Sequence, residues 1–94
     1  SAYISSKMAI WGLIKSYAKE LGPMGIRCNA VSPGLMETPY SSKISVRAKK
    51  IEEASNPMRR ICNPDDVART ICLLSTSGFI NGANLPVTGG QRMP

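Results

Sequence analysis

Histidine is absent from this 94-residue sequence, and aromatic residues make up only 5% of it. Without histidine, the chain holds neither the usual histidine-containing zinc sites nor a serine–histidine catalytic pair. No apolar run is long enough to predict a membrane span, so we expect no membrane partner. With 43% hydrophobic residues, the chain can cover only a modest and mainly aliphatic core.

Cysteine is also scarce, and the three residues Cys28, Cys62 and Cys72 form no Cys-x-x-Cys pair. An odd number of widely spaced cysteines favours buried free thiols in a reducing compartment. We therefore expect a cytoplasmic protein without disulfides and without a metal site.

Positive charge is in excess, with a formal net charge of +6. Such a balance can indicate nucleic acid, an anionic surface or an acidic partner. Here the lysines and arginines are scattered, and they lack the interleaved aromatics on which bases stack. We interpret them as solvated surface charges and predict no nucleic-acid binding.

Apolar residues recur at steps of three and four over residues 2–21, which predicts an amphipathic helix. Gly22 and Pro23 should end it, glycine by taking the left-handed cap conformation and proline because it cannot continue a helix. Because the helical pattern is already under way at Ser1, we expect the sequence to be a cut chain.

Two short runs predict strands at residues 26–31 and 84–87. Between them, residues 41–54 have helical spacing, and the Asn63-Pro64-Asp65-Asp66 segment is a strong helix start. A strand, a helical crossover and a second strand indicate an α/β fold with a parallel sheet. Pro86 cannot donate to a strand ladder, so the last strand should lie at a sheet edge or have the position of its missing donor face outward.

Tyr3 and Lys7 are four positions apart in the first predicted helix, which places them one turn apart on the same face. A tyrosine hydroxyl has an ordinary pKa near ~10, too high for easy proton exchange at neutral pH. An ammonium at ~4 Å with an effective dielectric of ~20 favours the phenolate by at most about 4 kcal/mol. Such a pair can exchange a proton with a carbonyl or alcohol oxygen, although a plain surface pair is the alternative.

The first strand runs into Ser32-Pro33-Gly34 and then a loop. Ligands of open α/β sheets bind outside the carboxyl ends of the strands, and Gly34 would let the backbone approach a planar ligand closely. An ordinary strand-ending turn is the alternative.

The segment Tyr3-Ile4-Ser5-Ser6-Lys7 resembles the Tyr-x-x-Ser-Lys motif of the short-chain dehydrogenase/reductase family. The segments that follow that motif in the family also have counterparts here, at the expected separations. They are residues 26–34, residues 35–38, residues 57–60 with 63–68, and residues 81–90. The likeness covers nearly the whole chain and is closest to the 3-oxoacyl-carrier-protein-reductase-like branch.

This resemblance implies the C-terminal part of a Rossmann-type doubly wound parallel sheet, incomplete as a stand-alone domain, and hydride transfer with NAD or NADP. Tyr3 would be the general acid/base, and Lys7 would lower its pKa and hold the nicotinamide ribose. Pro33, Gly34 and Met36 would meet the nicotinamide carboxamide, and Thr38 would reach towards the phosphates. Residues 41–54 would form a lid over a small carbonyl or alcohol substrate, which the branch suggests is linked to a carrier protein.

The departures from the family concern what lies upstream of the tyrosine there: the glycine-rich phosphate loop, the catalytic serine and an asparagine. We therefore expect residues 1–94 to be the C-terminal half of one oxidoreductase domain, to lack the N-terminal dinucleotide-binding half, and to be inactive alone. The rival hypothesis is a non-catalytic assembly or oligomerisation module, since the Tyr-Lys helix and final strand lie at subunit contacts in the family. Both hypotheses predict a homo-oligomer.

Overall fold

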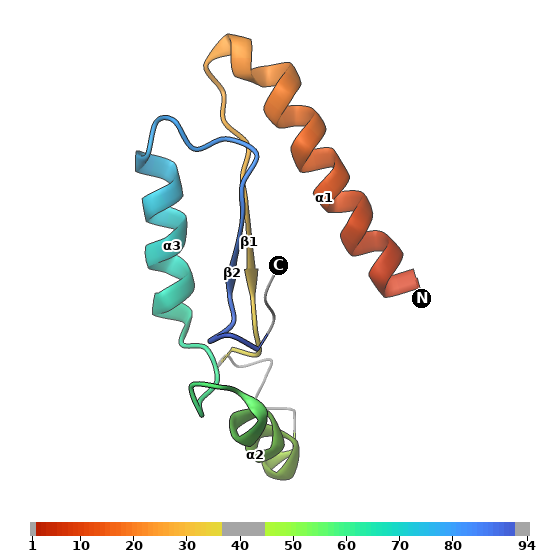
Figure 1. Cartoon of the computed structure of the whole chain (residues 1–94), viewed down its shortest axis with the longest axis vertical. Helices are drawn as coiled ribbons and strands as arrows, with labels where there is room; N and C mark the ends of the chain where they lie inside the picture. Colours follow the sequence, from red (N-terminus) through yellow and green to blue (C-terminus); the bar gives the residue numbers. More distant parts are fainter. Residues whose placement is uncertain (1, 37–44, 92–94) are drawn as a thin grey trace. The chain divides into compact units, whose positions relative to one another are not determined.

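The computed structural model describes residues 2–36 and 45–91, which fall into two compact units. One unit combines Ser1–Ala30 with Leu73–Asn84, and the other combines Val31–Cys72 with Leu85–Pro94. Figure 1 follows the element order α1, β1, α2, α3, β2 along the chain. The observed order of helices and strands is the one predicted from the sequence.

Helix α1 (Ala2–Leu21) has the predicted bounds, and its C-terminal half is packed. Ala18 is buried, and its carbonyl accepts a hydrogen bond of 2.8 Å from the side-chain amide of Asn81. A Cβ placed on Gly82 would lie 3.4 Å from the Cβ of Ala18. Towards the N-terminus the apolar stripe is uncovered, with Ile4 58% and Met8 70% exposed. The described residues of this unit therefore bury only one half of the amphipathic face.

The end of α1 differs from the prediction, because a short 3-10 helix (Gly22–Met24) follows it directly. The left-handed residue is Gly25, with φ 77°, and the prediction that Gly22 takes this conformation is wrong. Pro23 needs no hydrogen-bond acceptor in the first turn of the 3-10 helix, so the chain can wind one turn further before it leaves.

Strands β1 (Ala30–Pro33) and β2 (Asn84–Val87) form a two-stranded sheet. They are parallel: the Ala30 amide donates to Ala83 and the Gly34 amide donates to Val87, so partners advance in the same direction, and the arrows of Figure 1 point the same way. Both strands of the described two-stranded sheet are edge strands, so the position of β2 is compatible with Pro86.

The predicted bounds of the first strand, residues 26–31, are wrong at both ends. Before Ala30 the backbone pairing is irregular: the Cys28 amide donates to the side-chain oxygen Asn81 Oδ1 at 2.9 Å, while the Cys28 carbonyl accepts from the Gly82 amide at 2.9 Å. The side chain of Asn29 donates to the Ile80 carbonyl at 3.0 Å and accepts from the Ala83 amide at 2.9 Å. The β-branched pattern is present there, but regular pairing begins only at Ala30.

Helix α2 (Val46–Ser55) is capped by Ser45, whose hydroxyl accepts from the Ala48 amide at 3.1 Å. It falls within the predicted segment 41–54 except at its last residue, and residues 41–44 lie outside the described residues. Helix α3 (Pro64–Thr76) begins as predicted: Asn63 Oδ1 accepts from the Asp65 amide at 2.9 Å. No helix in residues 2–36 or 45–91 combines the length and the apolar content that crossing a membrane requires.

Candidate functional site

The carboxyl ends of the two parallel strands bring together the loop after β1 and the turn after β2, both in the second unit. The Gly34 amide donates to the Val87 carbonyl at 3.0 Å. One step further, the Cys62 amide donates to the Leu35 carbonyl at 2.8 Å, and Met36 forms a parallel bridge with Cys62. The loop is thus held by backbone hydrogen bonds as far as Met36.

Gly34 has no conformational or packing requirement for glycine within this structure. It is not among the residues with positive φ, and a Cβ placed on it would lie 3.6 Å from its nearest neighbour, the Thr88 Cα. That distance is an ordinary van der Waals contact, so alanine would fit without strain. Close approach of a ligand is a remaining physical reason for glycine here.

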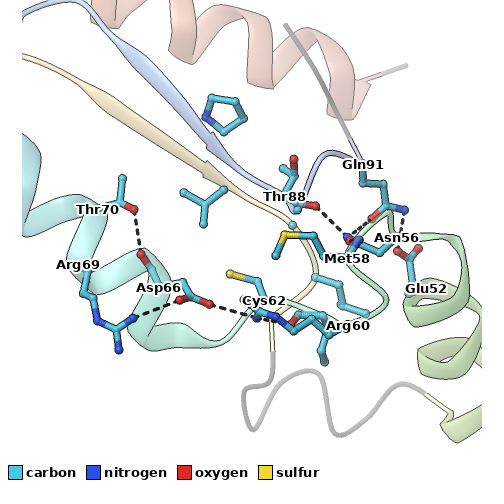
Figure 2. Close-up of a pocket in the computed structure, with 16 residues that line it drawn as sticks. Glu52, Asn56, Met58, Arg60, Cys62, Asp66, Arg69, Thr70, Thr88 and Gln91 are labelled. Carbon is cyan, nitrogen blue, oxygen red and sulfur yellow. Dashed lines mark hydrogen bonds and ion pairs between the residues drawn. The ribbon is translucent and has the colours of Figure 1, made fainter.

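A cavity of about 380 Å³ opens beside this edge, and all the residues that line it belong to the second unit. Its walls come from the loop after β1, the end of α2, residues 56–62, the first turns of α3 and the end of β2 (Figure 2). Leu35, Met58, Ile61 and Val87 supply apolar surface. The cavity therefore has the mixed apolar and polar lining of a small-molecule site.

Asn56 is the one buried polar side chain among the described residues, with 7% of its surface exposed. Its amide nitrogen donates to the Thr88 carbonyl at 2.8 Å, and its oxygen accepts from the Met58 amide at 2.8 Å. Gly89 packs against it so closely that a Cβ there would lie 2.6 Å from the Asn56 oxygen. This network fixes the position of residues 56–58 against the turn after β2.

At the other side of the cavity, Asp66 binds two guanidinium groups (Figure 2). Arg60 lies 3.2 Å from one carboxylate oxygen and Arg69 3.3 Å from the other. Both arginines are largely exposed, which agrees with their interpretation as surface charges.

Cys62 lies in the same wall, and its sulfur donates to the Asn63 carbonyl at 3.4 Å. Burial raises the pKa of the Cys62 thiol above its usual value, the negative charge of Asp66 raises it further, and Arg60 lowers it in part. The thiol is thus held in its protonated form, and it is no activated nucleophile. In the described part of the chain, no three His, Cys, Asp or Glu side chains gather as metal ligands would.

The site residues predicted from the sequence fall in both units. Tyr3 and Lys7 are one turn apart along the backbone of α1 in the first unit, and Lys7 is exposed. Pro33, Gly34 and Met36 belong to the second unit, at or just beyond the end of β1. Thr38 lies outside the described residues.

Sequence reasoning missed two side chains that organise these surroundings, Asn56 and Gln91. The Asn56-Pro57 dipeptide is a turn signal that could have indicated the first. Arg27 was interpreted as a solvated charge, and that is wrong: it is half-buried and donates to the carbonyls of Leu74 and Ser75 at 2.6 and 2.8 Å.

A parallel α/β strand pair with a Pro-Gly loop at its carboxyl end, after a Tyr-x-x-Ser-Lys helix, defines a part of a short-chain dehydrogenase/reductase. A family model described as "Enoyl-(Acyl carrier protein) reductase" matches residues 1–92. The chain therefore belongs to this family of short-chain oxidoreductases, and it is related to the 3-oxoacyl-carrier-protein reductases. Its Rossmann-type α/β class is confirmed by the solved structures that it resembles.

Three relatives illustrate the similarity. The mouse (Mus musculus) (3R)-3-hydroxyacyl-CoA dehydrogenase is 41% identical over 93 residues, covering 97% of this chain and 36% of that protein. The Thermotoga maritima 3-oxoacyl-[acyl-carrier-protein] reductase is 36% identical over 90 residues, covering 94% of this chain and 37% of that protein. The crystal structure of the Brucella melitensis 3-oxoacyl-[acyl-carrier protein] reductase matches with a TM-score of 0.90 and 34% identity, covering 98% of this chain and 35% of that one. The chain thus spans little more than a third of the length of these relatives.

Proposed function

We propose that residues 1–94 are the C-terminal part of a single oxidoreductase domain that transfers hydride between NAD or NADP and a carbonyl or alcohol. The observation that carries this proposal is Gly34, a glycine required by neither packing nor backbone strain at the carboxyl ends of parallel strands. In α/β folds this is where ligands bind. Family membership supplies the reaction type, and the names of the relatives suggest a thioester-linked 3-oxoacyl or 3-hydroxyacyl substrate.

The residues of this chain that would hold the nicotinamide end of the cofactor are Tyr3, Lys7, Pro33, Gly34 and Met36, with Thr38 nearer the phosphates. When bound, the cofactor supplies or accepts the hydride. The Gly34 amide already donates to Val87, so it would not donate to the ligand, and the absence of a side chain on Gly34 would let the ligand approach the backbone closely. The glycine-rich phosphate loop would come from the missing N-terminal half.

In reduction, Tyr3 would donate its phenolic proton to the carbonyl oxygen as the carbonyl carbon accepts hydride. The product is the alcohol, and Tyr3 is left as the phenolate, which the ammonium of Lys7 stabilises. Oxidation of the alcohol reverses both transfers. A general acid/base of this kind contributes about 10²–10⁴-fold to a rate.

The direct test joins residues 1–94 to the upstream two thirds of the Thermotoga maritima reductase, in place of that enzyme's matched region. We expect the joined protein to oxidise NADPH or NADH in the presence of a 3-oxoacyl thioester. The 94-residue chain alone should be inactive and should bind neither nucleotide at millimolar concentration. A folded joined protein without reductase activity, or nucleotide binding by the chain alone, would contradict the proposal.

The second candidate function is an assembly module, and exposed apolar side chains on more than one side of α1 favour it. Met8 is 70% exposed, and Ile10, Leu13 and Tyr17 are about half exposed. Apolar surface of this extent usually marks an interaction site. Light scattering on the 94-residue chain should then show an oligomer, whereas a clean monomer would count against this function.

A further inference from the structure

The last turn of α2 is joined to the turn after β2 by three polar side chains, Glu52, Asn56 and Gln91, which we call the clasp. Figure 2 shows them converging from α2, from the residue after it and from the C-terminal segment. Asn56 Nδ2 lies 3.4 Å from Gln91 Oε1, and Gln91 Nε2 donates to Glu52 Oε2 at 3.1 Å. The three side chains thus form one continuous chain of donors and acceptors.

The inner end of the clasp has a fixed orientation. The Asn56 amide nitrogen faces the Thr88 carbonyl and its oxygen faces the Met58 amide, each at 2.8 Å. Turning the amide over would place two oxygens against each other at Thr88. The orientation of Asn56 therefore determines which group it presents to Gln91, namely a donor.

The outer end of the clasp is exposed, and its hydrogen bonds, from Gln91 Nε2 to Glu52 at 3.1 Å and to Ser55 Oγ at 3.5 Å, are each weak. Its effect is local, because Glu52, Asn56 and Gln91 also line the cavity at the edge of the sheet. Loosening the clasp would let the last turn of α2 move away from the end of β2 and would widen this side of the cavity.

We propose that Asn56 and Gln91 are positioning residues that hold α2 against the end of β2 and so set the shape of the substrate cavity. The identity of the ligand rests on the proposed function, whereas the clasp itself does not. The clasp is specified by donor and acceptor pairing, and this makes it testable by exchanging the two partners.

The experiment measures amide hydrogen exchange in α2 of the full chain. Gln91→Glu places a second carboxylate against Glu52, so exchange of the α2 amides should accelerate about three- to tenfold. In the exchanged pair, Glu52→Gln with Gln91→Glu, the new side-chain amide on α2 and the amide of Asn56 can both donate to the new carboxylate. Exchange should then return to within about twofold of the parent, since the pairing is restored.

Two controls separate the clasp from a general effect. Glu53→Gln changes the same charge one residue away on α2 and should leave exchange unchanged. Gln91→Met removes the polar pairing without adding charge, and its acceleration should be confined to α2, with the amides of α3 unaffected.

The proposal is overturned if Gln91→Glu and Gln91→Met leave α2 exchange unchanged, or if the exchanged pair fails to restore it. Acceleration that spreads equally to α3 in both single variants would also overturn it, because Gln91 would then serve global stability alone. Amide hydrogen exchange is measured without nucleotide, so its result does not depend on whether the oxidoreductase proposal is correct.

Discussion

The guanidinium of Arg27 donates a hydrogen bond of 2.6 Å to the backbone carbonyl of Leu74, near the C-terminal end of α3. A second donor of the same group bonds the Ser75 carbonyl at 2.8 Å. The last carbonyls of a helix have no partner within it, and a guanidinium satisfies them in charge as well as geometry. The Arg27 side chain thus satisfies the carbonyls at the C-terminal end of α3 and holds the segment before β1 against that end.

Replacing Arg27 by lysine keeps the charge but removes the planar guanidinium, which reaches three carbonyls, those of Leu74, Ser75 and Ile80. We expect Arg27→Lys to lower the free energy of unfolding by about 1–2 kcal/mol, in the range for hydrogen bonds to charged groups at a half-buried site. Denaturant unfolding measures this, with Arg47→Lys on the exposed face of α2 as the matched control. Equal stability of the two variants would show that the fork is dispensable.

Gly89 is a position at which the backbone conformation and the packing both require glycine. It has φ 65°, and a Cβ on it would lie 2.6 Å from the Asn56 oxygen. The left-handed conformation alone costs a residue with a side chain about 1–2 kcal/mol, and the clash adds to this. Gly89→Ala should therefore lower the unfolding free energy by about 2 kcal/mol or more, as measured in denaturant.

The control for Gly89 is Gly12, which lies within α1 with open space around its Cβ position. Gly12→Ala should raise stability by up to about 1 kcal/mol, because alanine is the better helix former. A destabilising Gly12→Ala, or a neutral Gly89→Ala, would contradict the packing described here.

Cys62 makes stability depend on alkaline pH. Its folded-state pKa is raised above the usual value of 9.0, first by burial and then by Asp66. The unfolded chain therefore loses this proton at a lower pH than the folded chain does. The contribution to stability is complete below the unfolded pKa and is lost as pH rises from there through the folded pKa.

We expect the free energy of unfolding to fall above about pH 9, and part of that fall to vanish in Cys62→Ala. Asp66→Asn should bring the onset of Cys62 alkylation to a lower pH, since it removes a charge that raises the pKa. Alkylation followed by mass spectrometry separates Cys62 from the exposed Cys72. If Asp66→Asn moved the onset to a higher pH, the assigned cause would be wrong.

The elements that the sequence predicts well are those with a local cause. Helix α1 has its predicted bounds because apolar spacing and Pro23 both act within the segment itself. The start of α3 follows from Asn63, Pro64 and two acidic residues in the first turn. The start of β1 could not be predicted, because it depends on where a strand more than 50 residues away offers backbone partners.

The residues of the candidate site also differ in whether a local sequence pattern could predict them. The position of Gly34 just after a strand could be predicted because a strand followed by Pro-Gly has a local signature, whereas its role in binding stays a prediction. Asn56 and Gln91 were missed because they matter through their contact with each other, and no sequence periodicity predicts a contact between residues so far apart in the chain. Arg27 resembled any surface charge until its partners at the end of α3 were visible. The Tyr3 and Lys7 assignment, the cytoplasmic location and the homo-oligomer stay predictions.

The central claim is that the phenol of Tyr3 exchanges the proton of the reaction. Its most direct test is kcat/KM of the joined reductase carrying Tyr3→Phe, compared with Tyr17→Phe, which removes a hydroxyl from the same helix at a position without a lysine four residues on. We predict a loss of about 10²-fold or more for Tyr3→Phe and less than about twofold for Tyr17→Phe. A Tyr3→Phe enzyme as active as its parent would contradict the account.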